Sequence, residues 1–130
     1  MSINIPETKK KRIVIIGAGF AGLAFAKKMA KQDVQVVLID KNNYHQFQPL
    51  FYQVAMAGLE PSSISFPLRK LFQRKKNVFI RITKVVEVRH EEQEVLTELG
   101  CVPYDALIIA TGTQSNYFGN TDLARKTIPM

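Results

Sequence analysis

A glycine motif, G-x-G-x-x-G over residues 17–22, constrains the fold of this chain more than any other feature. It follows Arg12–Ile16, a β-branched run that is typical of a strand buried on both faces. It precedes Leu23–Lys31, where apolar residues recur at helical spacing and lysines gather near the end, the position at which cations favour the helix dipole. With a second apolar run at Val34–Ile39, this order predicts a strand–helix–strand unit with a right-handed parallel crossover.

Each glycine has a physical role in a turn of this kind. Gly17 permits the tight exit from the strand, Gly19 lets the backbone approach a pyrophosphate, and Gly22 lets the helix pack closely on the strand. A helix beginning near Phe20 directs its unpaired N–H groups and the positive end of its dipole toward phosphates. The motif therefore predicts a dinucleotide site at the end of the first strand.

An acidic residue supports a nucleotide at this turn. Asp40 closes the second strand, 18 residues after Gly22. A carboxylate there can accept hydrogen bonds from both ribose hydroxyls of an adenosine, and it would repel a 2′-phosphate. The competing interpretation is a glycine-rich turn beside an unrelated surface aspartate. We favour the nucleotide site because the strand, turn, helix and acid occur in the expected order.

The middle and the end of the chain are less regular. Between residues 41 and 66 we expect one short helix, around Leu50–Ala57. Pro67 can open another helix over Leu68–Arg74, because proline is well tolerated at a first helical position. The last 18 residues, after Gly112, contain no clear element.

Further apolar runs typical of strands follow the expected helix at Leu68–Arg74, and polar residues separate them. The expected strands, in chain order, are Val78–Ile82, a meander of Lys84–His90, Glu94–Glu98 and a piece near Val102, and the hydrophobic run Tyr104–Ala110. The fold class is therefore α/β, a Rossmann-like domain with a parallel sheet and an antiparallel β-meander. A nicotinamide-type domain more often has a helix where the meander lies, and the Ala110-Thr111-Gly112 turn is typical of FAD domains. FAD is preferred over NAD as the cofactor.

Composition excludes several other classes of protein. The 130 residues suffice for one domain, and 46% hydrophobic content suffices for a core. The single Cys101 excludes a disulfide framework and a cysteine zinc cage, and it fits a reducing, cytoplasmic compartment. The uncharged run Ile13–Ala26 is shorter than the roughly 20 residues of a membrane span. The net charge of +7 comes without zinc-finger or RNA-binding patterns, so we expect no nucleic-acid partner and no metal.

A longer motif indicates a family. Residues 43–55 read N-Y-H-Q-F-Q-P-L-F-Y-Q-V-A, which resembles the stretch of type II NADH dehydrogenases that runs from the FAD ribose to the flavin ring. The glycine motif and the later I-I-A-T-G-T-Q-S-N-Y-F-G over residues 108–119 extend the resemblance over nearly the whole chain. In that family, NADH reduces FAD and the flavin reduces a quinone.

The resemblance implies a set of cofactor-binding residues and no catalytic side chain, since hydride transfer is the chemistry of the flavin. The pyrophosphate would lie at the loop, the ribose at the end of the second strand, the adenine at the third strand, the flavin ring near the long motif, and the domain crossover at the last turn. The residues implied at the pyrophosphate are Gly17, Ala18, Gly19, Phe20, Ala21 and Gly22, and those at the ribose are Asp40 and Lys41. Ile82 would contact the adenine, Gln48, Pro49 and Leu50 would lie toward the flavin ring, and Thr111 and Gly112 would lie at the crossover.

The same resemblance divides the chain into parts. Residues 1–10 are expected to be a flexible lead-in, 11–112 the first segment of an FAD-binding domain, and 113–130 the start of a crossover to an absent NADH-binding domain. The full-length protein would lie on the inner face of the cell membrane, held there by an absent C-terminal part. We expect the chain alone to be inactive and to leave part of its apolar surface exposed. A homodimer is possible.

Two other functions compete with this interpretation. One is the FAD-binding part of another reductase with two dinucleotide-binding domains; a disulfide reductase would need a redox cysteine pair, which the sequence lacks. The other is a non-catalytic module that senses a dinucleotide, and the motif at residues 43–55 argues against it. His45 is expected to hold a loop by hydrogen bonds, and the basic residues at 69–76 are expected to be solvated.

Overall fold

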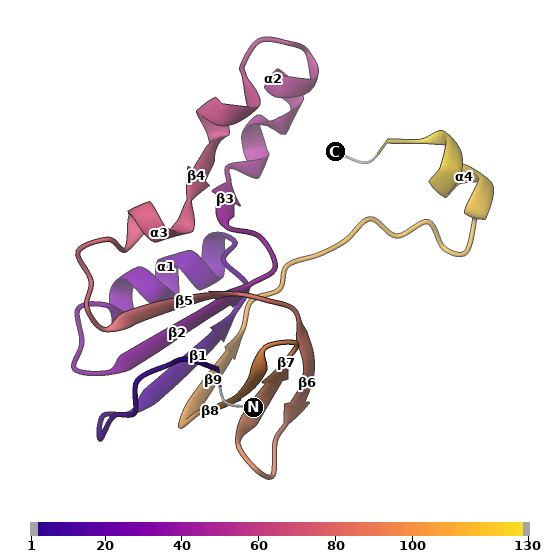
Figure 1. Cartoon of the computed structure of the whole chain (residues 1–130). Helices are drawn as coiled ribbons and strands as arrows, with labels where there is room; N and C mark the ends of the chain where they lie inside the picture. Colours follow the sequence, from indigo (N-terminus) through magenta and orange to yellow (C-terminus); the bar gives the residue numbers. More distant parts are fainter. Residues whose placement is uncertain (1–2, 129–130) are drawn as a thin grey trace.

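The computed structural model describes residues 3–128 and contains a four-stranded parallel sheet. The strands are β1 (Arg12–Ile16), β2 (Gln35–Asp40), β5 (Val78–Ile82) and β9 (Ala106–Ile109). Their order across the sheet is β5-β2-β1-β9, and helix α1 (Phe20–Met29) connects β1 to β2 (Figure 1). The predicted strand–helix–strand unit is therefore present.

The central strand β2 separates two hydrophobic cores. Successive side chains of a strand point to opposite faces of the sheet. Val36 and Leu38 accordingly belong to a first core under α1, together with Leu23. Val37 and Ile39 belong to a second core on the opposite face. The continuous apolar run of β2 is thus explained by burial on both faces, as expected for a central parallel strand.

A three-stranded antiparallel meander covers the second core. It consists of β6 (Val85–Arg89), β7 (Glu94–Thr97) and β8 (Gly100–Pro103), paired in the order β6-β7-β8. Val95 and Val102 lie opposite one another in neighbouring strands and are fully buried. The predicted α/β class, with a parallel sheet and an antiparallel meander, is confirmed. Cys101 lies within β8.

An arm that projects from the sheet connects β2 to the helix that begins at Leu68 (Figure 1). Its base is an antiparallel pair, β3 with β4, and the helical segments between them are η1, α2 and η2. In chain order these elements are β3 (Tyr44–Gln46), η1 (Gln48–Leu50), α2 (Phe51–Ala55), η2 (Pro61–Ile64) and β4 (Ser65–Pro67). The helix expected around Leu50–Ala57 is confirmed, but the sequence did not predict the strand pair.

The helix expected over Leu68–Arg74 is shorter in the structure than the sequence pattern predicts. Helix α3 covers only Leu68–Leu71, and Pro67 caps it rather than occupying its first turn. The next residue, Phe72, leaves the helical conformation and is only 4% exposed in the first core. Tertiary packing of Phe72 therefore ends a helix that the sequence pattern extended to Arg74.

The C-terminal segment contains a helix that the sequence analysis did not predict. Helix α4 spans Thr121–Lys126 and lies apart from the parallel sheet in Figure 1. Asn120 caps it, because its side-chain oxygen accepts a hydrogen bond from the Leu123 N–H at 3.0 Å. An Asn cap followed by Asp122 and later by two basic residues is a recognisable helix signal. That signal could have located α4.

The N-terminal residues take part in the core despite lacking regular structure. Residues 3–10 form no helix or strand, yet Ile3 is only 8% exposed and belongs to the second core. The Pro6 carbonyl accepts hydrogen bonds from the side chains of Arg12 and Gln35. This part of the expected lead-in is therefore packed against the sheet.

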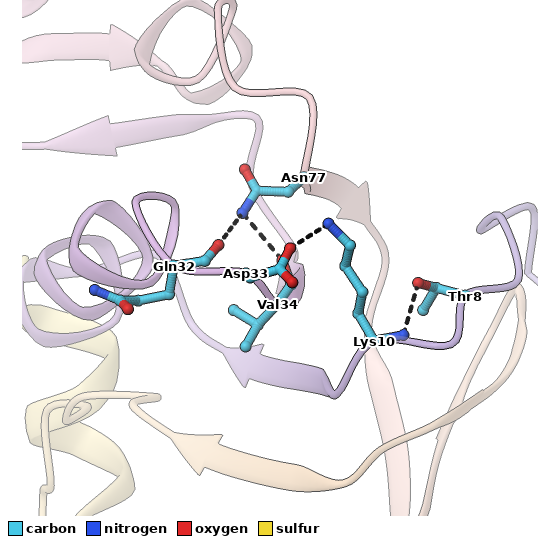
Figure 2. A network of polar contacts seen from close by, with 6 residues as sticks. All are labelled: Thr8, Lys10, Gln32, Asp33, Val34 and Asn77. Atoms are coloured by element: carbon cyan, nitrogen blue, oxygen red, sulfur yellow. Dashed lines mark hydrogen bonds and ion pairs between the residues drawn. The ribbon is translucent and has the colours of Figure 1, made fainter.

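Polar contacts close the turn between α1 and β2 (Figure 2). The Asn77 amide donates to the carbonyl oxygens of Gln32 at 3.2 Å and Val34 at 3.0 Å. Asp33, between them, forms an ion pair with Lys10. These contacts lie at the amino ends of the strands, away from the glycine loop.

Each helix in the described residues 3–128 is too short or too polar to span a lipid bilayer.

Candidate functional site

The glycine loop lies where the carboxyl ends of β1, β2 and β9 meet. Gly17 has a φ of 100°, in the left-handed region that favours glycine, and its N–H donates to the Ile39 carbonyl at 2.8 Å. A Cβ on Gly17 would lie 2.3 Å from the carbonyl oxygen of Ala110. Because β9 ends so close to this turn, no side chain fits at position 17.

The other two glycines differ in what surrounds them. A Cβ on Gly22 would lie 1.9 Å from the Gly17 carbonyl oxygen, so the helix packs directly on the loop. A Cβ on Gly19 would meet no atom within 4 Å. Gly19 precedes the first helical residue, and its carbonyl accepts the first helical hydrogen bond, from the Leu23 N–H at 2.9 Å. The backbone is therefore open to a ligand at Gly19, in front of the helix N-terminus.

Asp40 connects the end of β2 to the glycine loop. One carboxylate oxygen accepts the Ala18 N–H at 2.6 Å and the other accepts the Asn42 N–H at 2.7 Å. Asp40 also pairs with Ile82 across β2 and β5. The residues expected at the pyrophosphate, ribose and adenine thus share one edge of the sheet. A carboxylate offers about four acceptor positions, so Asp40 keeps capacity for ribose hydroxyls.

The Thr111-Gly112 turn completes this edge. The Ala110 N–H donates to the Ile16 carbonyl at 2.8 Å, which holds the end of β9 beside the end of β1. Gly112 has a φ of 71°, and a Cβ there would meet no atom within 4 Å. Like Gly19, it leaves open space beside the backbone. Ala110, which was not among the expected cofactor-binding residues, contributes the carbonyl that excludes a side chain at Gly17.

The residues expected near a flavin ring lie on the arm. Gln48, Pro49 and Leu50 form η1, which follows the β3 strand after one intervening residue. His45, in β3, is buried, and its Nδ1 lies 2.9 Å from the Ala18 carbonyl oxygen. The expectation that His45 holds a loop by hydrogen bonding is confirmed. The loop that it holds is the glycine loop.

Aromatic contacts reinforce this junction. The Phe20 ring packs edge-on against His45, with ring centroids 5.2 Å apart, and against Phe47, with centroids 5.4 Å apart. Such T-shaped pairs are favourable beyond their buried area. Phe47 was not among the expected site residues. Its place two residues after His45 on one strand end, in the H-x-F part of the motif, is the signal for this contact.

The charged residue within β5 is basic. Arg81 precedes Ile82, and its guanidinium donates to the Ile80 carbonyl at 2.9 Å. The pKa of Arg81 is lowered by partial burial and, to a smaller extent, by the positive charge of Arg69. Lys41 is exposed beyond Asp40. Residues 3–128 contain no cluster of three or more His, Cys, Asp or Glu side chains that could hold a metal ion.

Comparison with known proteins assigns this chain to a family. Residues 11–128 match the sequence pattern of the pyridine nucleotide-disulphide oxidoreductases. The chain belongs to this family. Among curated relatives it is 41% identical over 119 residues to the type II NADH:quinone oxidoreductase NdhA of Mycobacterium tuberculosis. It is 31% identical over 122 residues to an external alternative NAD(P)H-ubiquinone oxidoreductase of Arabidopsis thaliana mitochondria.

The match covers a minority of each relative. It includes 88% of this chain but 25% of NdhA, and 85% of this chain but 21% of the Arabidopsis protein. This pyridine nucleotide-disulphide oxidoreductase chain therefore spans about a quarter of the length of the relatives. The resemblance to type II NADH dehydrogenases is confirmed, in their N-terminal region.

Solved structures agree with the sequence matches. NDH2 from Plasmodium falciparum in complex with NADH has a TM-score of 0.81 at 27% identity, over 90% of this chain and 25% of that protein. The sulfide:quinone oxidoreductase of Aquifex aeolicus has a TM-score of 0.75 at 30% identity, over 82% of this chain and 25% of that protein. The arrangement of strands described above is thus shared with these two proteins.

Proposed function

We propose that this chain is the N-terminal FAD-binding part of a flavin oxidoreductase that transfers electrons from NADH through FAD to a quinone. The observation that carries the proposal is the meeting of the glycine loop, Asp40 and the Thr111-Gly112 turn at one edge of the sheet. Three of the relatives and structures named above have a quinone or ubiquinone in their names, which supports the electron acceptor.

The residues present fit an FAD at this edge. Open space beside Gly19 and Gly112 would admit a cofactor close to the backbone at two points. Gly17, Ala18, Phe20, Ala21 and Gly22 would hold the pyrophosphate through loop conformation and the helix N-terminus. Asp40 and Lys41 would hold the adenosine ribose, Ile82 the adenine, and Gln48, Pro49 and Leu50 the flavin side.

The protein would act by holding FAD in position. FAD, when bound, supplies the chemistry of accepting a hydride and passing electrons on. In this chain the carboxylate of Asp40 would accept from ribose hydroxyls, and the N–H groups at the start of α1 would donate to phosphate oxygens. The Thr111-Gly112 turn would let the chain leave along the cofactor. No residue of the chain is proposed as an acid, base or nucleophile.

The wider assignment follows from the same proposal. Residues 11–112 would be the first segment of the FAD-binding domain, and 113–130 the start of a crossover to an NADH-binding domain. Association with the inner face of the cell membrane, and a homodimer, are proposed for the complete protein only. The chain alone would have no NADH:quinone turnover, since NADH and quinone would bind elsewhere.

Cofactor analysis of the purified protein tests the proposal. The complete protein should carry FAD, identified by its visible absorbance and by chromatography of the released cofactor. It should also reduce a soluble quinone with NADH, whereas this chain alone should not. Bound NAD in place of FAD would favour a dinucleotide-sensing module and would overturn the proposal. Bound FAD without quinone reduction would favour another reductase of the same architecture.

A further inference from the structure

His45 and Asp40 hold the two backbone groups of one residue in the glycine loop. His45 Nδ1 lies 2.9 Å from the Ala18 carbonyl oxygen, and Asp40 accepts the Ala18 N–H at 2.6 Å. A carbonyl oxygen only accepts, so Nδ1 carries the proton in this contact. Ala18 lies between two glycines, which have the widest backbone freedom. Two side chains from the end of β2 and from β3 thus restrict the most flexible part of the loop.

The contact of His45 determines the direction of the next N–H group. The Ala18 C=O and the Gly19 N–H belong to one peptide unit, and no cis peptide bond occurs in the described residues. In a trans peptide these two groups point in opposite directions. With the carbonyl turned toward His45, the Gly19 N–H points away from His45. Within residues 3–128 this N–H has no hydrogen-bond acceptor, and the space beside Gly19 is open.

We propose that His45 is a positioning residue for the cofactor: through the Ala18 carbonyl it turns the Gly19 N–H toward the pyrophosphate. The inference rests on the proposed function, since it names what the oriented N–H binds. A loop held in its binding conformation loses less entropy when the ligand arrives. Without this hydrogen bond, the Ala18–Gly19 peptide is free to rotate, and its N–H is lost as a fixed donor.

The base of the arm holds His45 in position beside the glycine loop. Cross-strand pairing of His45 with Phe66 fixes β3 against β4, and the Phe47 N–H donates to the Ile64 carbonyl at 2.9 Å. The ring of Phe20, at the start of α1, packs on both His45 and Phe47. The backbone pairing of the arm base and these ring contacts therefore place His45 beside the glycine loop.

Three substitutions of His45 separate positioning from simple packing. Asn carries an amide nitrogen bonded to Cγ, as Nδ1 is in His, so His45→Asn keeps a donor near the Ala18 carbonyl. Gln carries its amide one carbon further out, so His45→Gln moves the donor, and His45→Ala removes it. Loss of one hydrogen bond corresponds to roughly a 5- to 10-fold change in affinity. We expect about tenfold weaker FAD binding for Ala and Gln, and less than about threefold for Asn.

A matched control lies across the strand pair. Phe66→Ala alters the partner of His45 in β4 but leaves the hydrogen bond to Ala18, so FAD affinity should stay within about twofold of wild type. All variants would be titrated with FAD as apoprotein, in the complete protein, with thermal unfolding measured in parallel. The Asn and Gln pair remains informative where His45→Ala does not fold.

The outcomes distinguish the inference from the proposed function. Equal FAD affinity of the Asn and Gln variants, or wild-type affinity in the Ala variant, would overturn the role of His45 while leaving FAD binding intact. Weakened binding in Phe66→Ala as large as in His45→Gln would assign the effect to arm packing and would also overturn it. Wild-type protein that binds no FAD would remove the proposed function itself.

Discussion

A Cβ on Gly22 would lie 1.9 Å from the carbonyl oxygen of Gly17, so helix α1 meets the loop backbone to backbone. Gly22→Ala should therefore force the helix away from the loop. Overpacking of this kind costs about 1–3 kcal/mol, and the nearest atoms here are main-chain atoms that cannot rotate aside. Urea unfolding of the two proteins, followed by circular dichroism, measures the loss. A stability equal to wild type would contradict a close contact between the helix and the loop.

Gly19→Ala is the matched control for this prediction. Gly19 has a φ of −72°, which alanine adopts without strain, and its Cβ would meet no atom within 4 Å. We expect the free energy of unfolding to change by less than about 0.5 kcal/mol. The same unfolding experiment therefore separates steric exclusion at Gly22 from a general intolerance of side chains in the loop.

Gly19→Val should remove cofactor binding while the fold persists. The open space beside Gly19 is where the proposed pyrophosphate approaches the backbone, and a branched side chain would occupy it. We expect FAD affinity to fall by at least about 100-fold, since several charge-assisted hydrogen bonds would be lost together. Flavin content after purification and an FAD titration measure this. Unchanged flavin content would remove the pyrophosphate from this loop.

Asp40→Asn tests the dual role of the acidic residue. An amide has one oxygen for the two N–H groups, of Ala18 and Asn42, that the carboxylate accepts, and it also loses the negative charge. We expect a loss of about 1–2 kcal/mol in unfolding free energy and about tenfold weaker FAD binding. Denaturant unfolding of the apoprotein gives the first value, and the FAD titration gives the second. A changed stability with unchanged FAD affinity would restrict Asp40 to holding the loop.

Asn120→Ala should loosen helix α4 without affecting the rest of the fold. The cap hydrogen bond from the Leu123 N–H is the only side-chain hydrogen bond at the start of this six-residue helix in the described residues, and the helix residues are exposed. Loss of an Asn cap costs about 1 kcal/mol of helix stability. Amide hydrogen exchange should therefore speed up in residues 123–127 alone. Equal protection in both proteins would mean that other contacts hold α4.

Local patterns sufficed for the strands of the sheet and for the glycine turn. The strands of the sheet are apolar runs with clear ends, and Gly22 contacts Gly17 within one turn, so neighbouring residues carry this information. Helix α3 shows the limit of such patterns. Its pattern runs to Arg74, but burial of Phe72 ends the helix at Leu71, and burial depends on residues far away in the sequence.

The junction of the arm with the loop could not be derived from spacing. Strands β3 and β4 have three residues each, too few for a reliable alternation, and they pair across a long intervening segment. The sequence suggested that His45 holds a loop, but not which loop. Only the folded chain brings His45 to the carbonyl of Ala18, 27 residues away.

The amino-acid sequence by itself determined the strand–turn–helix order, the glycine turn between that strand and helix, and the acid at the end of β2. Each depends on the pattern of a few consecutive residues. The tertiary structure decided how the loop is held, through Asp40, His45 and the end of β9. Those contacts join segments distant in the chain, and they form only when the packing of both cores places the strand ends side by side.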